Sequence, residues 1–242
     1  MEKLETMPRD WKRAMAVVAH PDDLEYGAAA AIAEWTDTGH EVCYLLATRG
    51  EAGIDTMEPE KAAVVREGEE RASAAVVGVS TVEFLGHRDG VLEEGVALRR
   101  DITAAIRRHR PDLLITVNHH DTWGGTDWNT PDHRAVGRAA LDAAGDAGNR
   151  WIFPEQLADA EPWNGVRWVA VSASPALTHV AEVGQRSVDR AIASLAQHRA
   201  YIAALTDQDP EDYARSIITE AIESLRESHG VERGVGFQLF AR

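Results

Sequence analysis

The chain has 242 residues, a length that fits one large α/β domain. Hydrophobic residues make up 44% and charged residues 27%, the balance of a globular protein rather than a disordered or fibrous one. The formal charge of −15 argues against the clustered Lys and Arg of a nucleic acid-binding protein. No stretch approaches the roughly 20 apolar residues of a membrane span, and residues 1–13 carry no apolar signal segment, so we expect a cytoplasmic protein without membrane contact.

Strand-like and helix-like segments alternate along the first half of the chain. Apolar runs at residues 14–19 and 42–48 flank a helical stretch that ends near Gly39, which is the pattern of a βαβ unit. The alternation continues with a helix at 60–77, a strand at 82–85, a helix at 95–108 and a strand at 112–117. Because the strand runs are apolar throughout, they predict a mostly parallel sheet with helices on both faces.

The second half begins with a long polar loop at residues 118–130, which is a candidate functional loop. A helix then starts with Thr130 as the expected N-cap and Pro131 at the first helical position. The remaining expected elements are a strand at 167–172, a helix at 185–205, a charged helix at 210–227 and a strand at 235–240. The charged run 67–71 is typical of a solvated helix face, and residues 234–236 of a turn.

No repeat or linker divides the chain, so we expect a single domain over residues 1–242. Its core would lie at about 14–205, followed by a C-terminal helix and strand at 206–242. The single cysteine, Cys43, excludes an intramolecular disulfide and a thiolate-rich zinc site. A bound metal must therefore use imidazole and carboxylate ligands.

Two acid–histidine clusters follow predicted buried strands. The first strand ends in Ala19-His20-Pro21-Asp22-Asp23-Leu24-Glu25, at the carboxyl edge where open α/β sheets bind ligands. His20 and Asp23 are spaced to reach one metal ion, and His133, behind Asp132 in a later helix, offers a third ligand. Either cluster alone is typical of a turn or a helix cap, but the two together favour a metal site.

Three protein ligands leave one coordination position open, which is the arrangement of a catalytic zinc with a bound water. Zinc lowers the pKa of that water to about 7, which supplies hydroxide as the nucleophile at neutral pH. Asp22 would act as the general base, and Asp132 could orient a ligand histidine. The expected reaction is metal-dependent amide hydrolysis.

The first cluster resembles the A-H-P-D-D-x-E signature of the zinc-dependent N-deacetylases. That family includes the PIG-L de-N-acetylases of glycosylphosphatidylinositol precursors, the LmbE-like proteins, and deacetylases and conjugate amidases of mycothiol and bacillithiol metabolism. The resemblance implies that His20 and Asp23 bind zinc and that Asp22 is the base. Residues 48–53 resemble the T-x-G-E-x-G loop of the family, and residues 88–90 resemble a segment in which an acid, here Asp89, contacts sugar hydroxyls.

The resemblance also implies an LmbE-like, Rossmann-like three-layer αβα fold and homo-oligomers, often trimers or hexamers. The implied substrate is a small molecule with an N-acyl, usually N-acetyl, amide on an amino sugar. The second motif departs from the family pattern, because Thr130 stands where H-P-D-H begins with a histidine, while the ligand histidine is retained as His133. The histidines that could replace the missing one are His119, His120 and His198.

Other residues are candidates for contacts around the site. Trp123, Trp128 and Trp163 could stack on a sugar or pack in the protein. Glu25 could support a ligand, and Arg49 could contact substrate or pair with Glu51. The sequence alone does not decide the role of any of these six side chains.

Two alternatives to an amino-sugar deacetylase remain open, and a third is disfavoured. A thiol-conjugate amidase would use the same zinc chemistry, and a non-catalytic ligand-binding relative is suggested by Thr130. A nucleotide-binding protein is disfavoured, since the first strand-to-helix turn has no G-x-G-x-x-G and carries two acids where a pyrophosphate would bind.

Overall fold

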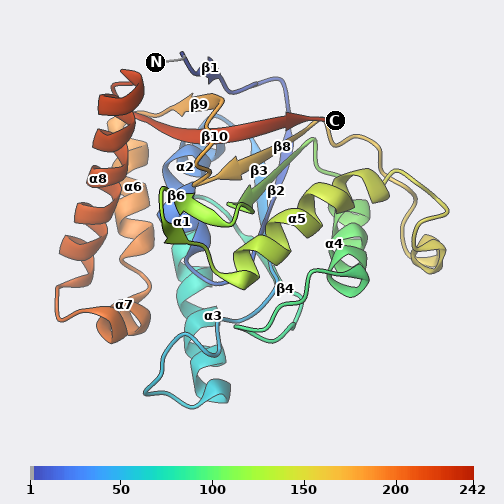
Figure 1. Cartoon of the computed structure of the whole chain (residues 1–242), viewed down its shortest axis with the longest axis horizontal. Coiled ribbons are helices and arrows are strands. Elements are labelled where there is room, and N and C mark those ends of the chain that lie inside the picture. The colour runs from blue at the N-terminus through green and yellow to red at the C-terminus, as the bar shows by residue number, and fades with distance from the viewer. Residues whose placement is uncertain (1–2) are drawn as a thin grey trace.

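An eight-stranded sheet with helices on both faces forms the centre of the computed structural model, which describes residues 3–242 (Figure 1). Across the sheet the strands are β1 (Glu5–Thr6), β9 (His179–Glu182), β10 (Gly234–Ala241), β8 (Trp168–Ser172), β5 (Leu113–Val117), β2 (Arg13–Val18), β3 (Glu41–Leu46) and β4 (Thr81–Phe84). Neighbouring strands from β8 to β4 are parallel, whereas β10 is antiparallel to both β8 and β9. The predicted mostly parallel α/β sheet is confirmed.

The helices are divided between the two faces of this sheet (Figure 1). They are α1 (Asp23–Gly27), α2 (Ala29–Asp37), α3 (Pro59–Val76), α4 (Val96–His109), α5 (Pro131–Asp146), α6 (Gln185–Leu195), α7 (Arg199–Leu205) and α8 (Pro210–His229). Helices α4 and α5 pack against each other over β2 and β5, while α6 packs against α2, α3 and α8 on the other face. The order of connections reverses between β2 and β5, which is where this type of sheet forms its ligand crevice.

The central strands are apolar because helices cover both of their faces. All five residues of β5 are buried, as are residues 14–18 of β2. Ala16 lies opposite Tyr44 of β3 on one side and Ile115 of β5 on the other, and all three side chains are buried. This rigid centre supports the loops that follow β2 and β5.

The predicted helix at 185–205 is two helices, and the break has a physical reason. Helix α6 ends at Leu195, and His198 is the N-cap of α7 with a non-helical backbone. The break turns the His198 side chain inward, where it is fully buried and faces the carboxylates of Glu25 and Glu70. An unbroken helix would not allow this interior position together with the packing of α7 on α3 and α8.

Two smaller expectations are wrong. Glu70, inside the charged run 67–71, is buried rather than solvated, because its carboxylate contacts the backbone N–H of Asp22. Residues 234–236 belong to β10 rather than to a turn, and a Cβ on Gly236 would lie 2.6 Å from Leu177 Cδ1. Glycine is needed there for close approach.

The sequence also did not predict several short elements. These are β1, β9, the 3₁₀ helix Pro154–Ala158, and a hairpin of β6 (Thr122–Gly124) and β7 (Asp127–Trp128) within the long polar loop.

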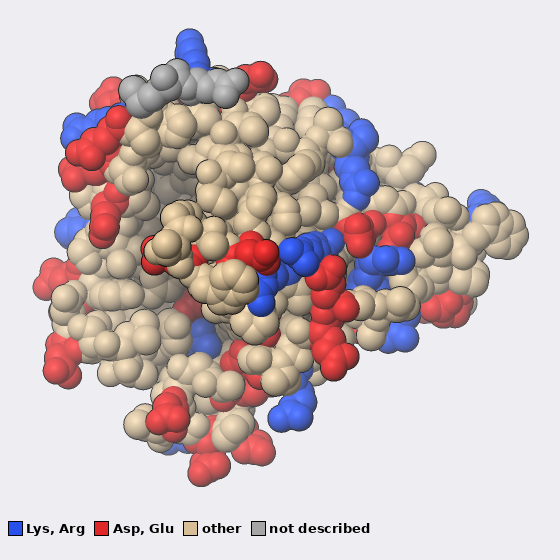
Figure 2. All heavy atoms as spheres, in the orientation of Figure 1, with Lys and Arg blue, Asp and Glu red and all other residues tan. Residues whose placement is uncertain are grey.

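Among residues 3–242, no helix has both the length and the apolar character that crossing a membrane requires. On the face shown in Figure 2, Lys and Arg are interspersed with Asp and Glu, so this face has no continuous basic patch.

Candidate metal centre

The turn after β2 is held in an unusual conformation by helix α3. Asp22 has a φ of 91°, in the left-handed region that non-glycine residues seldom adopt. Arg66 Nη2 donates to the Pro21 carbonyl at 2.6 Å, and Glu70 Oε2 accepts from the Asp22 N–H at 3.1 Å. These contacts hold both polar ends of one peptide group, since the carbonyl of Pro21 and the N–H of Asp22 share it. Helix α3 therefore fixes the direction in which Asp22 leaves the turn.

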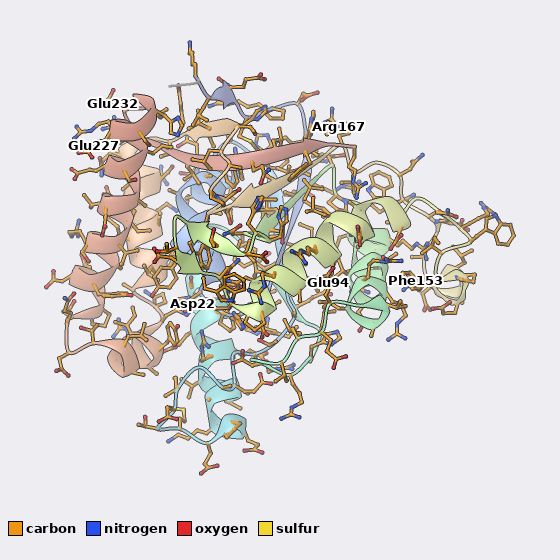
Figure 3. The ribbon with its side chains drawn as sticks, viewed as in Figure 1. Asp22, Glu94, Phe153, Arg167, Glu227 and Glu232 are labelled. Atoms are coloured by element: carbon orange, nitrogen blue, oxygen red, sulfur yellow. The ribbon has the colours of Figure 1, made fainter. Side chains whose placement is uncertain are left out.

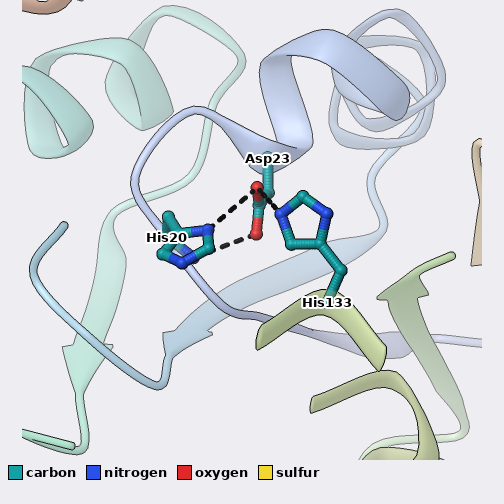
Figure 4. A group of neighbouring side chains, drawn as sticks. All are labelled: His20, Asp23 and His133. Carbon is teal, nitrogen blue, oxygen red and sulfur yellow. Dashed lines mark hydrogen bonds and ion pairs between the residues drawn. The ribbon is translucent and has the colours of Figure 1, made fainter. Parts of the chain in front are cut away.

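Asp23, the first residue of α1, divides its two carboxylate oxygens between two tasks. Its Oδ2 accepts from the backbone N–H groups of Ala19 and His20, each at 2.9 Å. Its Oδ1 lies 2.9 Å from His133 Nε2 and 3.6 Å from His20 Nδ1 (Figure 4). Burial opposes ionisation, but the two imidazoles bring the pKa of Asp23 well below its usual range. One ionised oxygen is thus directed at both histidines.

Two carboxylates lie within hydrogen-bond distance of His20 Nε2, the ring nitrogen that points away from Asp23. His20 Nε2 lies 3.0 Å from Asp89 Oδ1 and 3.1 Å from Asp132 Oδ2. Asp132 is itself fixed, because its two oxygens accept from backbone N–H groups in the segment 90–92. These acceptors hold a proton on Nε2, so Nδ1, which faces Asp23, would be the nitrogen that gives its lone pair to a metal.

His133 lies in the first turn of α5, as predicted, and its ring is also oriented from behind. Thr130 caps the helix by accepting from the His133 N–H at 3.4 Å, which confirms the predicted cap. Asn129 Oδ1 lies 3.2 Å from His133 Nδ1, and the Asn129 Nδ2 group donates to two loop carbonyls. Asn129 would therefore hold a proton on Nδ1 when Nε2, which faces Asp23, gives its lone pair to a metal. Trp123 packs edge-on against it at 5.3 Å between ring centroids.

One ligand atom from each of His20, Asp23 and His133 lies within 4.8 Å of the other two. Two imidazole nitrogens and one carboxylate oxygen are a donor set that zinc and similar divalent metals prefer. The hydrogen bonds behind each ring are those that orient metal-binding histidines in proteins. These three residues form a candidate metal centre, here called the pocket triad.

The pocket triad opens into a cavity of about 480 Å³. Its wall also includes Asp22, Tyr26, Arg66, Asp89, Trp123, Thr130 and Tyr201. Asp22 lies inside the outline of the molecule, whereas Glu227 and Glu232 lie at its edge (Figure 3). Burial raises the pKa of Asp22 to about 6, although the Arg66 guanidinium, 3.3 Å away, opposes the rise. Asp22 is therefore mostly ionised at neutral pH. Its pKa is also close enough to neutral pH for the carboxylate to accept and release a proton readily.

Two of the candidates for substrate contact lie elsewhere. Arg49 is absent from the cavity wall, and its Nε donates to Glu67 at 2.8 Å instead of pairing with Glu51. His120 lies 2.8 Å from the side chain of Gln238 on β10. By contrast, Asp89 and Trp123 both line the cavity.

No histidine in the described cavity wall takes the place that Thr130 occupies. His20 and His133 are the histidines of that wall, so His119, His120 and His198 lie outside it. Glu25 and His198 instead meet behind the cavity, where His198 Nε2 is 3.7 Å from Glu25 and 3.8 Å from Glu70. Glu25, Glu70 and His198 form a second cluster, here called the sealed triad because all three are buried.

Sequence reasoning missed Arg66, Glu70, Tyr26 and Tyr201. Arg66 and Glu70 are four residues apart and therefore share one face of α3. The Arg66 guanidinium lies over the ring of Tyr201, with 4.2 Å between its Cζ atom and the ring centroid. The hydroxyl oxygens of Tyr26 and Tyr213 are 2.9 Å apart. The sequence offered one signal for these contacts, the four-residue spacing of Arg66 and Glu70 on a helix. That spacing is also common on solvated helices, so it did not single them out.

Comparison with known proteins agrees with this geometry. The diacetylchitobiose deacetylase of Thermococcus kodakarensis is 33% identical over 141 residues, which are 57% of this chain and 51% of that protein. The 1D-myo-inositol 2-acetamido-2-deoxy-alpha-D-glucopyranoside deacetylase of Kineococcus radiotolerans is 30% identical over 168 residues, 56% of this chain and 46% of that protein. The chain thus spans about half the length of the curated relatives it matches.

A solved structure extends the similarity to almost the whole chain. The N,N'-diacetylchitobiose deacetylase from Pyrococcus horikoshii superposes with a TM-score of 0.82 and 25% identity, covering 96% of this chain and 85% of that one. Residues 15–144 match the family described as PIG-L, GlcNAc-PI de-N-acetylase. These residues hold the whole pocket triad and Asp22, and they are more than half of the sequence. The chain belongs to the PIG-L family.

Proposed function

We propose that this protein is a zinc-dependent deacetylase that hydrolyses the N-acetyl amide of an amino sugar or a related small metabolite. The observation that carries the proposal is the pocket triad with the buried carboxylate of Asp22 beside it in one cavity. The relatives named as deacetylases of diacetylchitobiose and of an inositol-linked acetamido sugar support the substrate class.

Zinc would be held by His20, Asp23 and His133, whose donor atoms and fixed tautomers suit it. When bound, it would polarise the amide carbonyl and acidify a water molecule. The carboxylates of Asp89 and Asp132 would keep the His20 ring in place and increase its basicity.

Asp22 would move the proton that hydrolysis transfers. Its carboxylate accepts a proton from the attacking water and then delivers it to the nitrogen as the carbon–nitrogen bond breaks. The products are a carboxylic acid and a free amine. Arg66 keeps Asp22 ionised before the reaction, and the contact of Glu70 with the Asp22 backbone keeps it directed into the cavity.

The polar part of the wall suits a sugar. Asp89 and Arg66 line the cavity near the metal centre and can bind hydroxyl groups, while Trp123 offers an aromatic edge. Because Asp89 also contacts His20, a sugar hydroxyl bound to Asp89 would be close to the reacting amide. A non-catalytic role is less well supported, since the relatives that the chain matches are named deacetylases.

The test is a product screen with zinc-loaded protein. N,N'-diacetylchitobiose, N-acetylglucosamine, an inositol-linked N-acetylglucosamine and an N-acetylated thiol conjugate would each be incubated, and released acetate and free amine measured. The variant Asp22→Asn should lower kcat by about 10²–10⁴-fold while retaining zinc. The matched control is Asp159→Asn, which changes an exposed aspartate after the 3₁₀ helix and should keep full activity.

Two results would refute the proposal. One is zinc-loaded protein that releases acetate from none of these compounds. The other is an Asp22→Asn variant as active as the wild type, which would show that another group moves the proton.

A further inference from the structure

A second cavity of about 370 Å³ adjoins the metal-facing one. Tyr26, Gly27, Trp123 and Ala173 belong to the walls of both cavities, so the two cavities lie side by side at these residues. The second cavity continues between α8, the start of α2 and the beginning of β10. We call it the side chamber.

The side chamber has an apolar wall. Its large side chains are Trp123, Leu177, Ile218, Ile222 and Leu225. The rest of the wall includes small residues such as Ala28, Ala29 and Ala30. Any Cβ on Gly236 would lie 2.6 Å from Leu177 Cδ1, so Leu177 already packs against the bare backbone there.

Several polar groups in this wall have protein partners, although Glu25 Oε2 is buried there without a hydrogen bond. Ser174 donates to Gln238 at 2.8 Å, and Ser228 donates to the Ser224 carbonyl at 2.6 Å. The Tyr26 hydroxyl is within hydrogen-bond distance of Tyr213, and Glu25 accepts from Ser73. The chamber therefore offers few free hydrogen-bond partners to a sugar. Burial of an apolar group there would be favourable.

An amide substrate has one substituent on each side of its reacting bond. The amino-sugar side needs polar partners, which Asp89 and Arg66 supply in the metal-facing cavity. The acyl side of a substrate needs apolar surface, which the side chamber supplies. We propose that the side chamber is an acyl-chain site and that the protein prefers amino sugars whose N-acyl chain is longer than acetyl.

This inference rests on the proposed function and deepens it. The reaction is the same hydrolysis: water adds its oxygen to the acyl carbon, the carbon–nitrogen bond breaks, and the amine takes the proton. The product acid is then a medium-chain carboxylic acid, which leaves from the side chamber.

The experiment compares N-acetyl-, N-butanoyl-, N-hexanoyl- and N-octanoylglucosamine with the zinc-loaded protein. Full burial is expected to raise kcat/KM by about fourfold for each added methylene group until the chamber is full. Octyl N-acetylglucosaminide, which carries its alkyl chain on the sugar instead, should show no such gain. Octanoate should also inhibit hydrolysis of N-acetylglucosamine at a lower concentration than acetate does.

The blocking variant is Ala221→Trp, which adds an indole to the chamber wall from α8. It should lower the octanoyl-to-acetyl ratio of kcat/KM at least tenfold. The control is Thr219→Trp, which adds the same side chain on the same helix outside both cavities and should keep the wild-type ratio. If Ala221→Trp folds poorly, octanoate inhibition of the wild type still tests the chamber.

The outcomes separate this inference from the proposed function. Hydrolysis of the N-acetyl compound with no gain from longer chains would refute the acyl-chain site and leave the deacetylase standing. A higher kcat/KM for the octyl glycoside alone would place the alkyl chain of the aglycone in the chamber, which would also refute the acyl-chain site. Failure of every N-acylglucosamine, including acetyl, would overturn both.

Discussion

The pocket triad and the sealed triad contain the same kinds of residue in different surroundings. In the pocket triad, each imidazole has a protein acceptor on the nitrogen that points away from Asp23, so the other nitrogen is the one available to a metal. In the sealed triad, neither ring nitrogen of His198 has a hydrogen-bond partner, and its nearest carboxylate oxygens are 3.7 and 3.8 Å away. The outer contacts, and not the residue types, distinguish a candidate metal ligand from a buried charge.

The two triads also differ in what they do for Asp22. The pocket triad shares a cavity with its carboxylate, while the sealed triad reaches its backbone through Glu70. Burial opposes the charge of His198, but Glu25 and Glu70 raise its pKa to about 9. Burial raises the pKa of Glu70 well above its usual range. A charged His198 therefore stabilises the packing of α1, α3 and α7 behind the site.

Removal of a pocket ligand should have the largest effect. His133→Ala takes one of three donors from the metal centre, so zinc affinity should fall by more than about 100-fold and activity should be lost. Zinc content after dialysis and kcat/KM would be measured. His109→Ala, on the C-terminal turn of α4, is the control and should keep its zinc. Full zinc occupancy in His133→Ala would remove His133 from the centre.

Loss of an outer contact should have a smaller effect. Asp132→Asn keeps a side-chain acceptor but removes the charge that faces His20 Nε2, so zinc affinity should fall by about 10–100-fold. Competition with a chromophoric chelator would measure the affinity. An unchanged affinity would mean that Asp89 alone orients the His20 ring.

The sealed triad should instead affect stability and its dependence on pH. The pKa of His198 is raised on folding, so its contribution is fully present below pH about 6.5 and is lost as pH rises through about 9. Glu70, whose pKa is also raised, loses its contribution in the same direction. Urea unfolding of metal-free protein should show a loss of roughly 2–3 kcal/mol between pH 6.5 and 9.

His198→Gln provides the comparison for that experiment. It removes the titrating imidazole, so the stability of the variant should depend less on pH over the same range. A wild-type slope that survives in His198→Gln would assign the titration to another group, such as Glu70.

Arg49→Ala should have the smallest effect, because Arg49 belongs to neither triad. Its partner is the partly exposed Glu67, and such pairs contribute about 0–1 kcal/mol. We expect kcat/KM within about threefold of the wild type and a similar melting temperature. A large rise in KM would instead show that Arg49 turns toward substrate.

The parts of the site that are local in sequence could be predicted, and the parts that need distant packing could not. His20, Asp22 and Asp23 lie in one turn after a recognisable strand, and Thr130 and Pro131 mark a helix start by their own chemistry. The meeting of those two segments followed from the rule that parallel strands end at the same edge. That the whole chain is one domain remains a prediction.

Buried charge has no local signature. Glu70 and Arg66 lie in a helix whose sequence is typical of a solvated surface, and their burial depends on contact with a turn more than 40 positions away. The same holds for His198, whose interior position breaks a helix that propensity alone would continue. The side chamber likewise depends on α8 meeting β10, which no motif indicates.

The pocket triad joins segments that are 110 positions apart, since His133 meets Asp23 only in the folded chain. An unfolded chain would offer a metal only the adjacent His20 and Asp23, so it would bind weakly. By mass action, a free metal concentration 100 times the dissociation constant would then add about 2.7 kcal/mol to the free energy of unfolding. The supply of the metal would set the lifetime of the protein as well as its activity.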